Sequence, residues 1–319
     1  MWVGLALLLG GCLDPNDPGA LVPPTASEDP GLPQLSVEVA GARRGLHVQT
    51  FGDPSLPPLF VIPGGPGADF RLLLPLAALA DHHFVVMWDL RGAGLSDRVP
   101  NRELTLESID EEVAAVKAHF APDRKVSLVG HSFGGAVFLR YTARHPDDVE
   151  KLVMIEPMLF TAAARAGYSG GRPAAFAPPV QEAFWQNEYL SPQDHAAADF
   201  KVAGAIREAT RNFYCDGEEP DPYPLWRYGA IASEVVMARI GEAGPDFDFS
   251  EGIDAFDGPM LLLAGSCGAL GIDVQERFNV ERVPGAEIVT IDGAGHISLF
   301  TSRADETIAA LRSFLEAPP

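Results

Sequence analysis

The feature of this sequence that most restricts its fold is an alternation of short apolar runs with amphipathic segments. The runs are Leu59–Ile62, Phe84–Trp88, Val126–Val129, Leu152–Ile155, Met260–Ala264 and Ile288–Ile291. Short runs without polar alternation are typical of strands buried on both faces of a parallel sheet. Because helices between parallel strands cover the two faces of the sheet, the pattern predicts a three-layer α/β fold.

Two further strands and a clear helix fit the same pattern. Leu35–Val39 and Leu46–Phe51 alternate apolar with polar residues and are predicted to be half-buried strands. Between Ile109 and Phe120, apolar residues recur at spacings of four, three and four, which places them on one face of a helix.

The alternation stops between residues 158 and 257. This segment has no strand-like run, but it carries helical stripes of apolar residues. The stripes are Val235, Val236 and Ile240, and Phe184 with Trp185. We therefore expect a helical lid at residues 158–257, inserted between the two parts of the sheet domain, residues 34–157 and 258–319.

The N-terminal residues are typical of an export signal. Trp2–Leu9 is apolar but too short to span a bilayer, which needs about 20 residues. Residues 9–12, Leu-Gly-Gly-Cys, resemble a bacterial lipobox, so residues 1–12 are predicted to be a signal peptide that leaves Cys12 lipidated. The proline-rich residues 13–33 are predicted to be an extended tether. This predicts an exported bacterial lipoprotein, anchored to a membrane in the periplasm or at the cell surface.

The charge restricts the partners of such a protein. With 23 basic and 44 acidic residues the net charge is −21. Nucleic acids and anionic bilayers repel such a chain, so we expect no nucleic-acid partner and contact with a membrane only through the lipid anchor. The histidine spacing suggests no metal site, and no cofactor is expected.

The most informative motif is Gly-His-Ser-Phe-Gly at residues 130–134, which lies between a predicted buried strand and a helical segment. A serine on such a sharp strand-to-helix turn is held in a strained backbone conformation, and the flanking glycines avoid clashes. The N-terminus of the helix then favours negative charge beside it. This context predicts that Ser132 is a nucleophile.

A second glycine-rich turn, Pro-Gly-Gly-Pro-Gly at residues 63–67, follows the strand Leu59–Ile62. Glycines let backbone N–H groups approach a substrate oxygen closely. We therefore predict an oxyanion hole formed by the N–H of Gly64 or Gly65 together with that of Phe133.

These motifs resemble those of α/β-hydrolases of the proline iminopeptidase type. That family carries a His-Gly-Gly-Pro-Gly turn, an Asp-Gln-Arg-Gly-x-Gly-x-Ser segment and a Gly-x-Ser-x-Gly-Gly elbow, and the corresponding stretches here are residues 63–67, 89–96 and 130–135. Pro63 replaces the family's histidine and Leu90 its glutamine. The resemblance covers roughly Leu35 to Leu315 and implies a three-layer α/β-hydrolase fold with a mostly parallel sheet and an inserted helical lid.

A serine needs a base, and His296 is the candidate. It lies in Gly-Ala-Gly-His directly after the strand Ile288–Ile291. In α/β-hydrolases the order along the chain is Ser, then Asp or Glu, then His, and His296 is the histidine late enough in the chain.

The acid of the triad is less clear. The resemblance implies a position that is Gly268 here. Two carboxylates remain: Asp273, which a capping box at the start of the next helix could also explain, and Glu156 at the end of the strand Leu152–Ile155. We favour Glu156 and keep Asp273 as the alternative.

Apart from Cys12, the cysteines are Cys215 in the predicted lid and Cys267 after a core strand. An exported protein can keep a disulfide between them, and two separate thiols are the alternative.

These features predict a serine hydrolase acting by acyl transfer on a peptide, amide or ester carbonyl of a small molecule or peptide. A free amino terminus on the substrate would suit the acidic lid, whose eligible carboxylates are Glu182, Glu188, Asp216, Glu218 and Glu219. The alternatives are a small-molecule esterase and a non-catalytic tethered binding protein on the same scaffold.

Overall fold

The computed structural model of the chain describes residues 22–168, 195–218 and 223–318. In these residues the strands form one eight-stranded sheet in the order β1-β2-β4-β3-β5-β6-β7-β8. The strands are β1 (Gln34–Val39), β2 (Ala42–Phe51), β3 (Pro58–Ile62), β4 (Phe84–Trp88), β5 (Val126–His131), β6 (Val149–Ile155), β7 (Met260–Gly265) and β8 (Glu287–Ile291). At one edge, β1 pairs antiparallel with β2, and β2 pairs antiparallel with β4. The other neighbours, from β4 through β3, β5, β6 and β7 to β8, pair in parallel.

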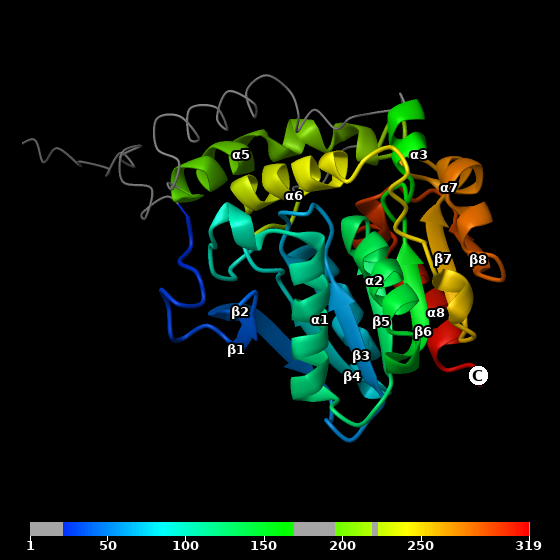
Figure 1. Cartoon of the computed structure of the whole chain (residues 1–319). Helices are drawn as coiled ribbons and strands as arrows, with labels where there is room; N and C mark the ends of the chain where they lie inside the picture. The colour runs from blue at the N-terminus through cyan, green and yellow to red at the C-terminus, as the bar shows by residue number, and fades with distance from the viewer. Residues whose placement is uncertain (1–21, 169–194, 219–222, 319) are drawn as a thin grey trace, which may run out of the picture.

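Helices cover both faces of the sheet. α1 (Leu106–Phe120) and α2 (Phe133–Arg144) share one apolar cluster with one face. The 3-10 helix Phe70–Asp81 and α8 (Ala304–Leu315) share a second cluster with the other face. The sheet is visible between these layers (Figure 1), so the predicted three-layer α/β fold is confirmed.

All eight predicted strands are present, but one differs in burial. β8 was expected to be buried on both faces, and this expectation is wrong because the strand forms the edge of the sheet. Ile288 is 36% exposed, and only the end of the strand, at Ile291, is buried.

The inserted segment 158–257 interrupts the sheet between β6 and β7. It contains α3 (Ala162–Gly167), α5 (His195–Ala209) and α6 (Ala230–Glu242). α5 and α6 lie side by side across the carboxyl ends of the strands (Figure 1). Val236 and Ile240 of the predicted stripe are buried in the core, whereas Phe184 and Trp185 lie outside the described residues.

The described part of the predicted tether, residues 22–33, contacts the body, which corrects the prediction of a free tether for these residues. Thr25 and Ala26 are 3% and 1% exposed. The N–H of Ala26 donates to Leu95 O at 2.7 Å, and that of Ser27 to the carboxylate of Asp97 at 2.9 Å. Prolines did not prevent packing here, because these backbone groups find partners on the body.

Cys12 and the rest of residues 1–21 lie outside the described residues. In the part that is described, no helix has the length and apolar character to cross a bilayer.

Candidate active site

Ser132 lies at a sharp turn between β5 and α2, as the motif predicts. Its backbone has φ 55° and ψ −119°, a left-handed conformation that is costly for a residue with a side chain. The flanking glycines are required by space: a Cβ on Gly130 would lie 2.3 Å from Gly134 O, and one on Gly134 would lie 2.5 Å from Pro63 O. The turn therefore presents the serine at the carboxyl edge of the sheet.

The turn at residues 63–67 lies against this serine. A Cβ on Gly64 would lie 2.6 Å from Ser132 Cβ, so only a glycine permits this approach. Within the described part of the chain, the N–H groups of Gly64, Gly65 and Phe133 donate no hydrogen bond. They are available to a substrate oxygen, as an oxyanion hole requires.

A buried histidine–carboxylate pair lies beside the elbow. His296 Nδ1–H donates to Glu156 Oε2 at 2.6 Å, and the residues are 2% and 0% exposed. The other carboxylate oxygen accepts the N–H of Gly265 at 2.7 Å. Glu156 directly follows β6 and has φ 38°, so it shares a positive φ with Ser132 although neither is a glycine. Fixing Nδ1 as a donor leaves Nε2 free to accept a proton.

Burial governs the protonation of this pair. It raises the pKa of Glu156 to about 8, although the hydrogen bond from Gly265 acts in the opposite direction. It lowers the pKa of His296 to about 3. When Glu156 is ionised and His296 is neutral, the pair carries one buried negative charge. Adding one proton makes the pair neutral. Because burial disfavours a net charge, it favours this protonated, neutral form of the pair.

Asp273, the alternative acid, does not approach the histidine. It is exposed in the first turn of α7 (Ile272–Phe278), and no contact joins it to His296. The predicted capping box is also wrong, because the helix starts two residues earlier than a box with Asp273 as its N-cap requires. Its N-cap is Gly271, which makes no side-chain hydrogen bond.

The ring of His296 contacts the elbow through His131, with ring centroids 4.2 Å apart. His131 immediately precedes Ser132. No hydrogen bond joins Ser132 to His296, both of which the structure describes. Such bonds are often long before substrate binds and shorten in the complex.

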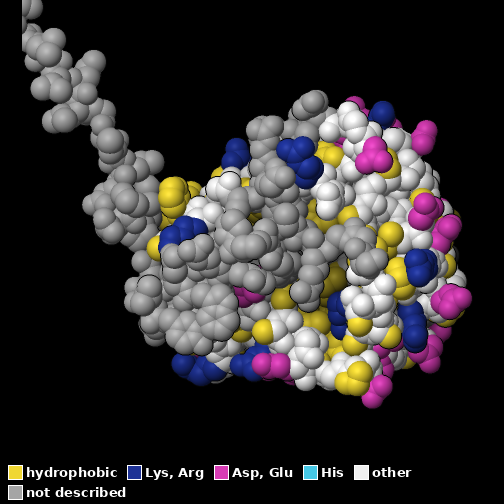
Figure 2. All heavy atoms as spheres, turned by 90° about the horizontal axis from the view of Figure 1, so that it is seen from above, with side chains coloured by type: hydrophobic (Ala, Val, Ile, Leu, Met, Phe, Trp, Pro, Cys, Tyr) yellow, Lys and Arg dark blue, Asp and Glu magenta, His cyan; other side chains and the backbone are white. Residues whose placement is uncertain are grey.

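The inserted segment contacts the turn at residues 63–67. The N–H of Gly229 donates to Gly67 O at 2.8 Å. The buried carboxylate of Asp69 accepts the N–H groups of Trp226 and Arg227 at 2.6 and 2.9 Å. Seen from above, this face has hydrophobic side chains near its centre, and many Asp and Glu side chains lie at its rim (Figure 2).

The same segment contacts the loop of His296. Cys215 and Cys267 form a disulfide with their Cα atoms 5.2 Å apart, which answers the question that the sequence left open. The ring of Phe213 lies 4.7 Å from that of His296. Phe213 lies in no local motif, so the sequence gives no signal for its place beside His296.

The acidic residues considered for an ammonium group are distributed unevenly. Glu218 accepts hydrogen bonds from the N–H of Cys215 and from Ser298 Oγ, and Asp216 is exposed. Glu182, Glu188 and Glu219 lie outside the described residues. Among the residues that are described, no cluster of three or more His, Cys, Asp or Glu side chains could hold a metal ion.

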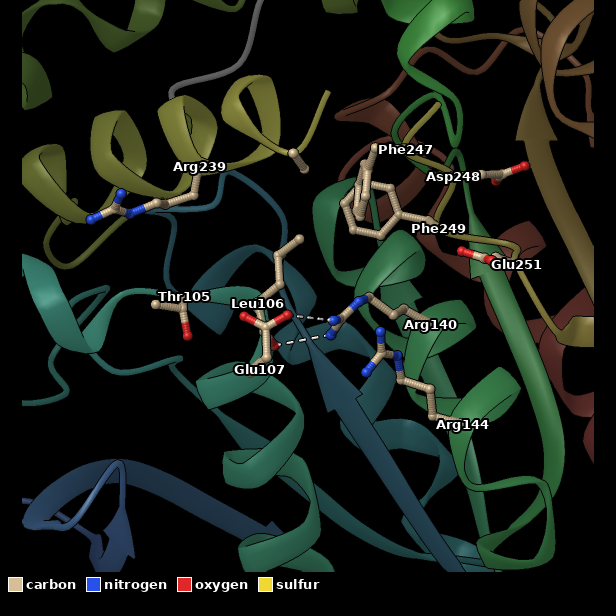
Figure 3. A pocket seen from close by; sticks show the side chains of 11 residues that line it. Thr105, Leu106, Glu107, Arg140, Arg144, Arg239, Phe247, Asp248, Phe249 and Glu251 are labelled. Atoms are coloured by element: carbon tan, nitrogen blue, oxygen red, sulfur yellow. Dashed lines mark hydrogen bonds and ion pairs between the residues drawn. The ribbon is translucent and has the colours of Figure 1, made fainter. Parts of the chain in front are cut away.

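A cavity of about 630 Å³ lies elsewhere, between the first turn of α1, the middle of α2 and the end of α6 (Figure 3). Arg140 on its wall donates to Glu107 at 3.0 Å and also pairs with Asp110. Arg239 pairs with Glu242 at 2.8 Å. None of the predicted site residues lines it.

Comparisons with known proteins identify the fold family. The family model for the alpha/beta hydrolase fold matches residues 57–302. A proline iminopeptidase of Thermoplasma volcanium is 22% identical over 277 residues, 81% of this chain and 88% of that protein. A putative esterase/lipase of Haemophilus influenzae is 26% identical over 241 residues, 75% of this chain and 76% of that protein.

A solved structure agrees on the fold. The crystal structure of a probable hydrolytic enzyme from Pseudomonas aeruginosa has a TM-score of 0.68 at 17% identity, covering 93% of this chain and 99% of that one. The family match spans most of the chain, including β3 to β8 and every residue of the predicted site. The chain therefore belongs to the family of hydrolases with the alpha/beta hydrolase fold.

Proposed function

We propose that the chain is a serine hydrolase that transfers an acyl group from a peptide, amide or ester carbonyl to water. Ser132 is the nucleophile, His296 the base and Glu156 the acid that orients it. The observation that carries the proposal is the buried 2.6 Å hydrogen bond between His296 and Glu156, placed beside a strained serine turn.

The reaction follows from these positions. Ser132 Oγ attacks the carbonyl carbon while its proton passes to Nε2 of His296. The N–H of Phe133 and that of Gly64 or Gly65 stabilise the negative oxygen of the tetrahedral intermediate. The imidazolium gives its proton to the leaving amine or alcohol, and an acyl-enzyme remains. Water, deprotonated by the same imidazole, then releases the acid and restores the serine.

A fluorophosphonate probe tests the nucleophile. The wild type is expected to be labelled at Ser132, and Ser132→Ala and His296→Ala are expected to lose the label. The exposed Ser302→Ala is the matched control and should keep it. If the folded wild type is not labelled, the protein is instead a non-catalytic binding protein on this scaffold.

We propose that the activity is proline iminopeptidase-like, and the alternative is that of a small-molecule esterase. The relatives named proline iminopeptidase and esterase/lipase support one reading each. The test compares kcat/KM for a prolyl amide with a free amino group, its N-acetyl counterpart and p-nitrophenyl esters. A preference for the free amine supports the peptidase reading, and hydrolysis of esters alone supports the alternative.

We further infer that the chain is exported and anchored through a lipid on Cys12. The disulfide in the body supports this inference, because such bonds persist in oxidising compartments. Metabolic labelling with a fatty-acid analogue should label the wild type and not Cys12→Ser, which should become soluble. Equal labelling of both proteins would contradict the anchor.

A further inference from the structure

Among the described residues, two rings contact the imidazole of His296, and they come from different parts of the chain. His131, beside the nucleophile, lies 4.2 Å away at an interplanar angle of 37°. Phe213, from the inserted segment, lies 4.7 Å away at 43°. The hydrogen bond to Glu156 fixes one nitrogen of the ring, but a single bond leaves the ring free to tilt and swing about it.

The backbone of Phe213 is held against the loops that carry the base and its surroundings. The N–H of Ala269 donates to Asn212 O at 2.9 Å. A Cβ on Gly295 would lie 2.5 Å from Phe213 O, and one on Gly268 would lie 3.2 Å from the same oxygen. Both loops thus need glycine where the inserted segment approaches.

Two further links fasten this contact. The disulfide Cys215–Cys267 begins two residues after Phe213 and ends in the loop after β7. Cys267 in turn donates its N–H to Ala294 O at 3.2 Å, two residues before His296. Glu218 accepts from the N–H of Cys215 at 3.0 Å and from Ser298 Oγ at 3.3 Å, which joins the segment to the loop of His296.

We propose that Phe213 is a positioning residue that holds the His296 imidazole in the orientation needed for proton transfer with Ser132, and that the Cys215–Cys267 disulfide keeps Phe213 in place. This inference rests on the proposed function of His296 as the base. Phe213 touches no reacting atom and acts through the imidazole. A displacement of about 1 Å at a catalytic group can cost about 10²-fold in rate, so a ring contact of this kind is sufficient to matter.

The contact also keeps water from the dyad. The titratable groups in contact with the His296 ring are Glu156 and His131. Glu218 contacts Ser298 in the same loop, and Tyr168 interacts electrostatically with the Glu156 carboxylate. Removal of the Phe213 ring admits water to a pair whose active form is negatively charged. The midpoint of the acid limb of kcat/KM is therefore expected to move to lower pH.

The test compares Phe213→Ala, Phe213→Leu and Phe213→Tyr on a p-nitrophenyl ester, with the full chain. For Phe213→Ala we expect kcat to fall by about 10²-fold, KM to stay within about threefold and the acid limb to move down in pH. Phe213→Leu controls for lost volume and should lower kcat as well. Phe213→Tyr keeps the ring and should restore both kcat and the pH midpoint.

The double variant Cys215→Ser/Cys267→Ser tests the disulfide, and it should resemble Phe213→Ala in kcat and in pH profile. Circular dichroism and fluorophosphonate labelling at saturating time check that each variant is folded and still carries a reactive Ser132. If the labelled wild type and all these variants share one kcat and one pH profile, the positioning role is refuted and the serine hydrolase stands. If the wild type itself is neither active nor labelled, the proposed function fails, and this inference fails with it.

Discussion

At the scale of residues, the unusual feature is the buried Glu156 directly after β6, which we propose as the acid of the triad. The position at which the family resemblance places the acid is Gly268, and the inserted segment fills the space beside it, since a Cβ there would lie 3.2 Å from Phe213 O. Glu156 instead reaches His296 from the neighbouring strand, with φ 38° at its own backbone. Backbone strain of this kind persists where the surroundings hold the residue in place.

The first prediction assigns the acid. Glu156→Gln should lower kcat by about 10⁴-fold, because an amide cannot fix the histidine tautomer or stabilise the imidazolium. Asp273→Asn is the matched control and should leave kcat unchanged, since this carboxylate is exposed in α7. Steady-state turnover of a p-nitrophenyl ester measures both variants. The reverse ranking would return the role to Asp273.

A second prediction concerns the empty family position. Gly268→Asp in the Glu156→Gln background should not restore turnover. Gly268 has φ +87°, which is strained for any residue with a side chain, and the backbone of Phe213 crowds its Cβ. The measurement is kcat of the double variant against Glu156→Gln alone. Recovery of more than about tenfold would show that the space is more adaptable than this geometry implies.

The pH profile gives a third prediction. The base form of the dyad has lost the shared proton, and burial raises the pKa of Glu156 to about 8, so this form is populated only as the pH rises through that region. The value of kcat/KM should therefore rise between pH 6 and pH 9, with a midpoint of about 8. Initial rates in constant ionic strength buffers measure it. A plateau already reached at pH 6 would contradict a dyad that holds its proton tightly.

The sequence singled out Ser132, His296 and the glycines proposed for the oxyanion hole for a common reason. Each lies in a short motif next to a recognisable strand, so local sequence is enough to define its place. The acid stayed open between two residues because the choice depends on which carboxylate is buried. The place of Phe213 beside His296 could not be predicted, since it depends on a contact between segments far apart in the chain.

At the scale of elements, the turn from β3 and the turn from β5 into α2 form one unit. Gly64 packs on Ser132, and Gly134 packs on Pro63 O. Each turn can approach the other this closely only because the other turn has a glycine at the point of contact. The strands were predictable because their apolar runs are short and uninterrupted. The start of α7 was not predictable, because the sequence after Asp273 fits a capping box although Gly271 is the N-cap residue. Burial of β8 was overestimated because composition does not reveal which strand lies at the edge.

The fourth prediction tests that unit. Gly64→Ala would place Cβ 2.6 Å from Ser132 Cβ, so the turn must move and carry its N–H away from the oxyanion site. Loss of one such donor costs about 10²–10³ in kcat. Gly241→Ala in α6 is the matched control, because nothing lies within 4 Å of its Cβ. Equal kcat for Gly64→Ala and the wild type would remove this turn from the oxyanion hole.

At the scale of the whole molecule, one buried carboxylate joins three distant segments. Asp199 of α5 accepts from Arg98 at 2.8 Å, from Arg227 at 2.8 Å and from the N–H of Ala230 at 2.9 Å. Arg227 also donates to Pro23 O at 2.8 Å, so the network reaches the N-terminal segment. The inserted segment is thus fastened to the body at this point as well as at the disulfide.

The last prediction follows from this network. Asp199→Asn removes the carboxylate charge that pairs with Arg98 and Arg227, and leaves Arg227 with Glu28 at 3.8 Å as a more distant partner. Breaking a buried ion pair in this way costs about 3–5 kcal/mol. For a chain of this size the midpoint of thermal unfolding should fall by about 5–10 °C, and the N-terminal segment should become easier to cleave by protease. Asp246→Asn, at an exposed carboxylate, is the matched control. Thermal melts followed by circular dichroism at fixed pH and salt measure the difference. Equal melting of the two variants would mean that the three segments are held together by other contacts, such as the disulfide and the apolar packing of α5 against α6.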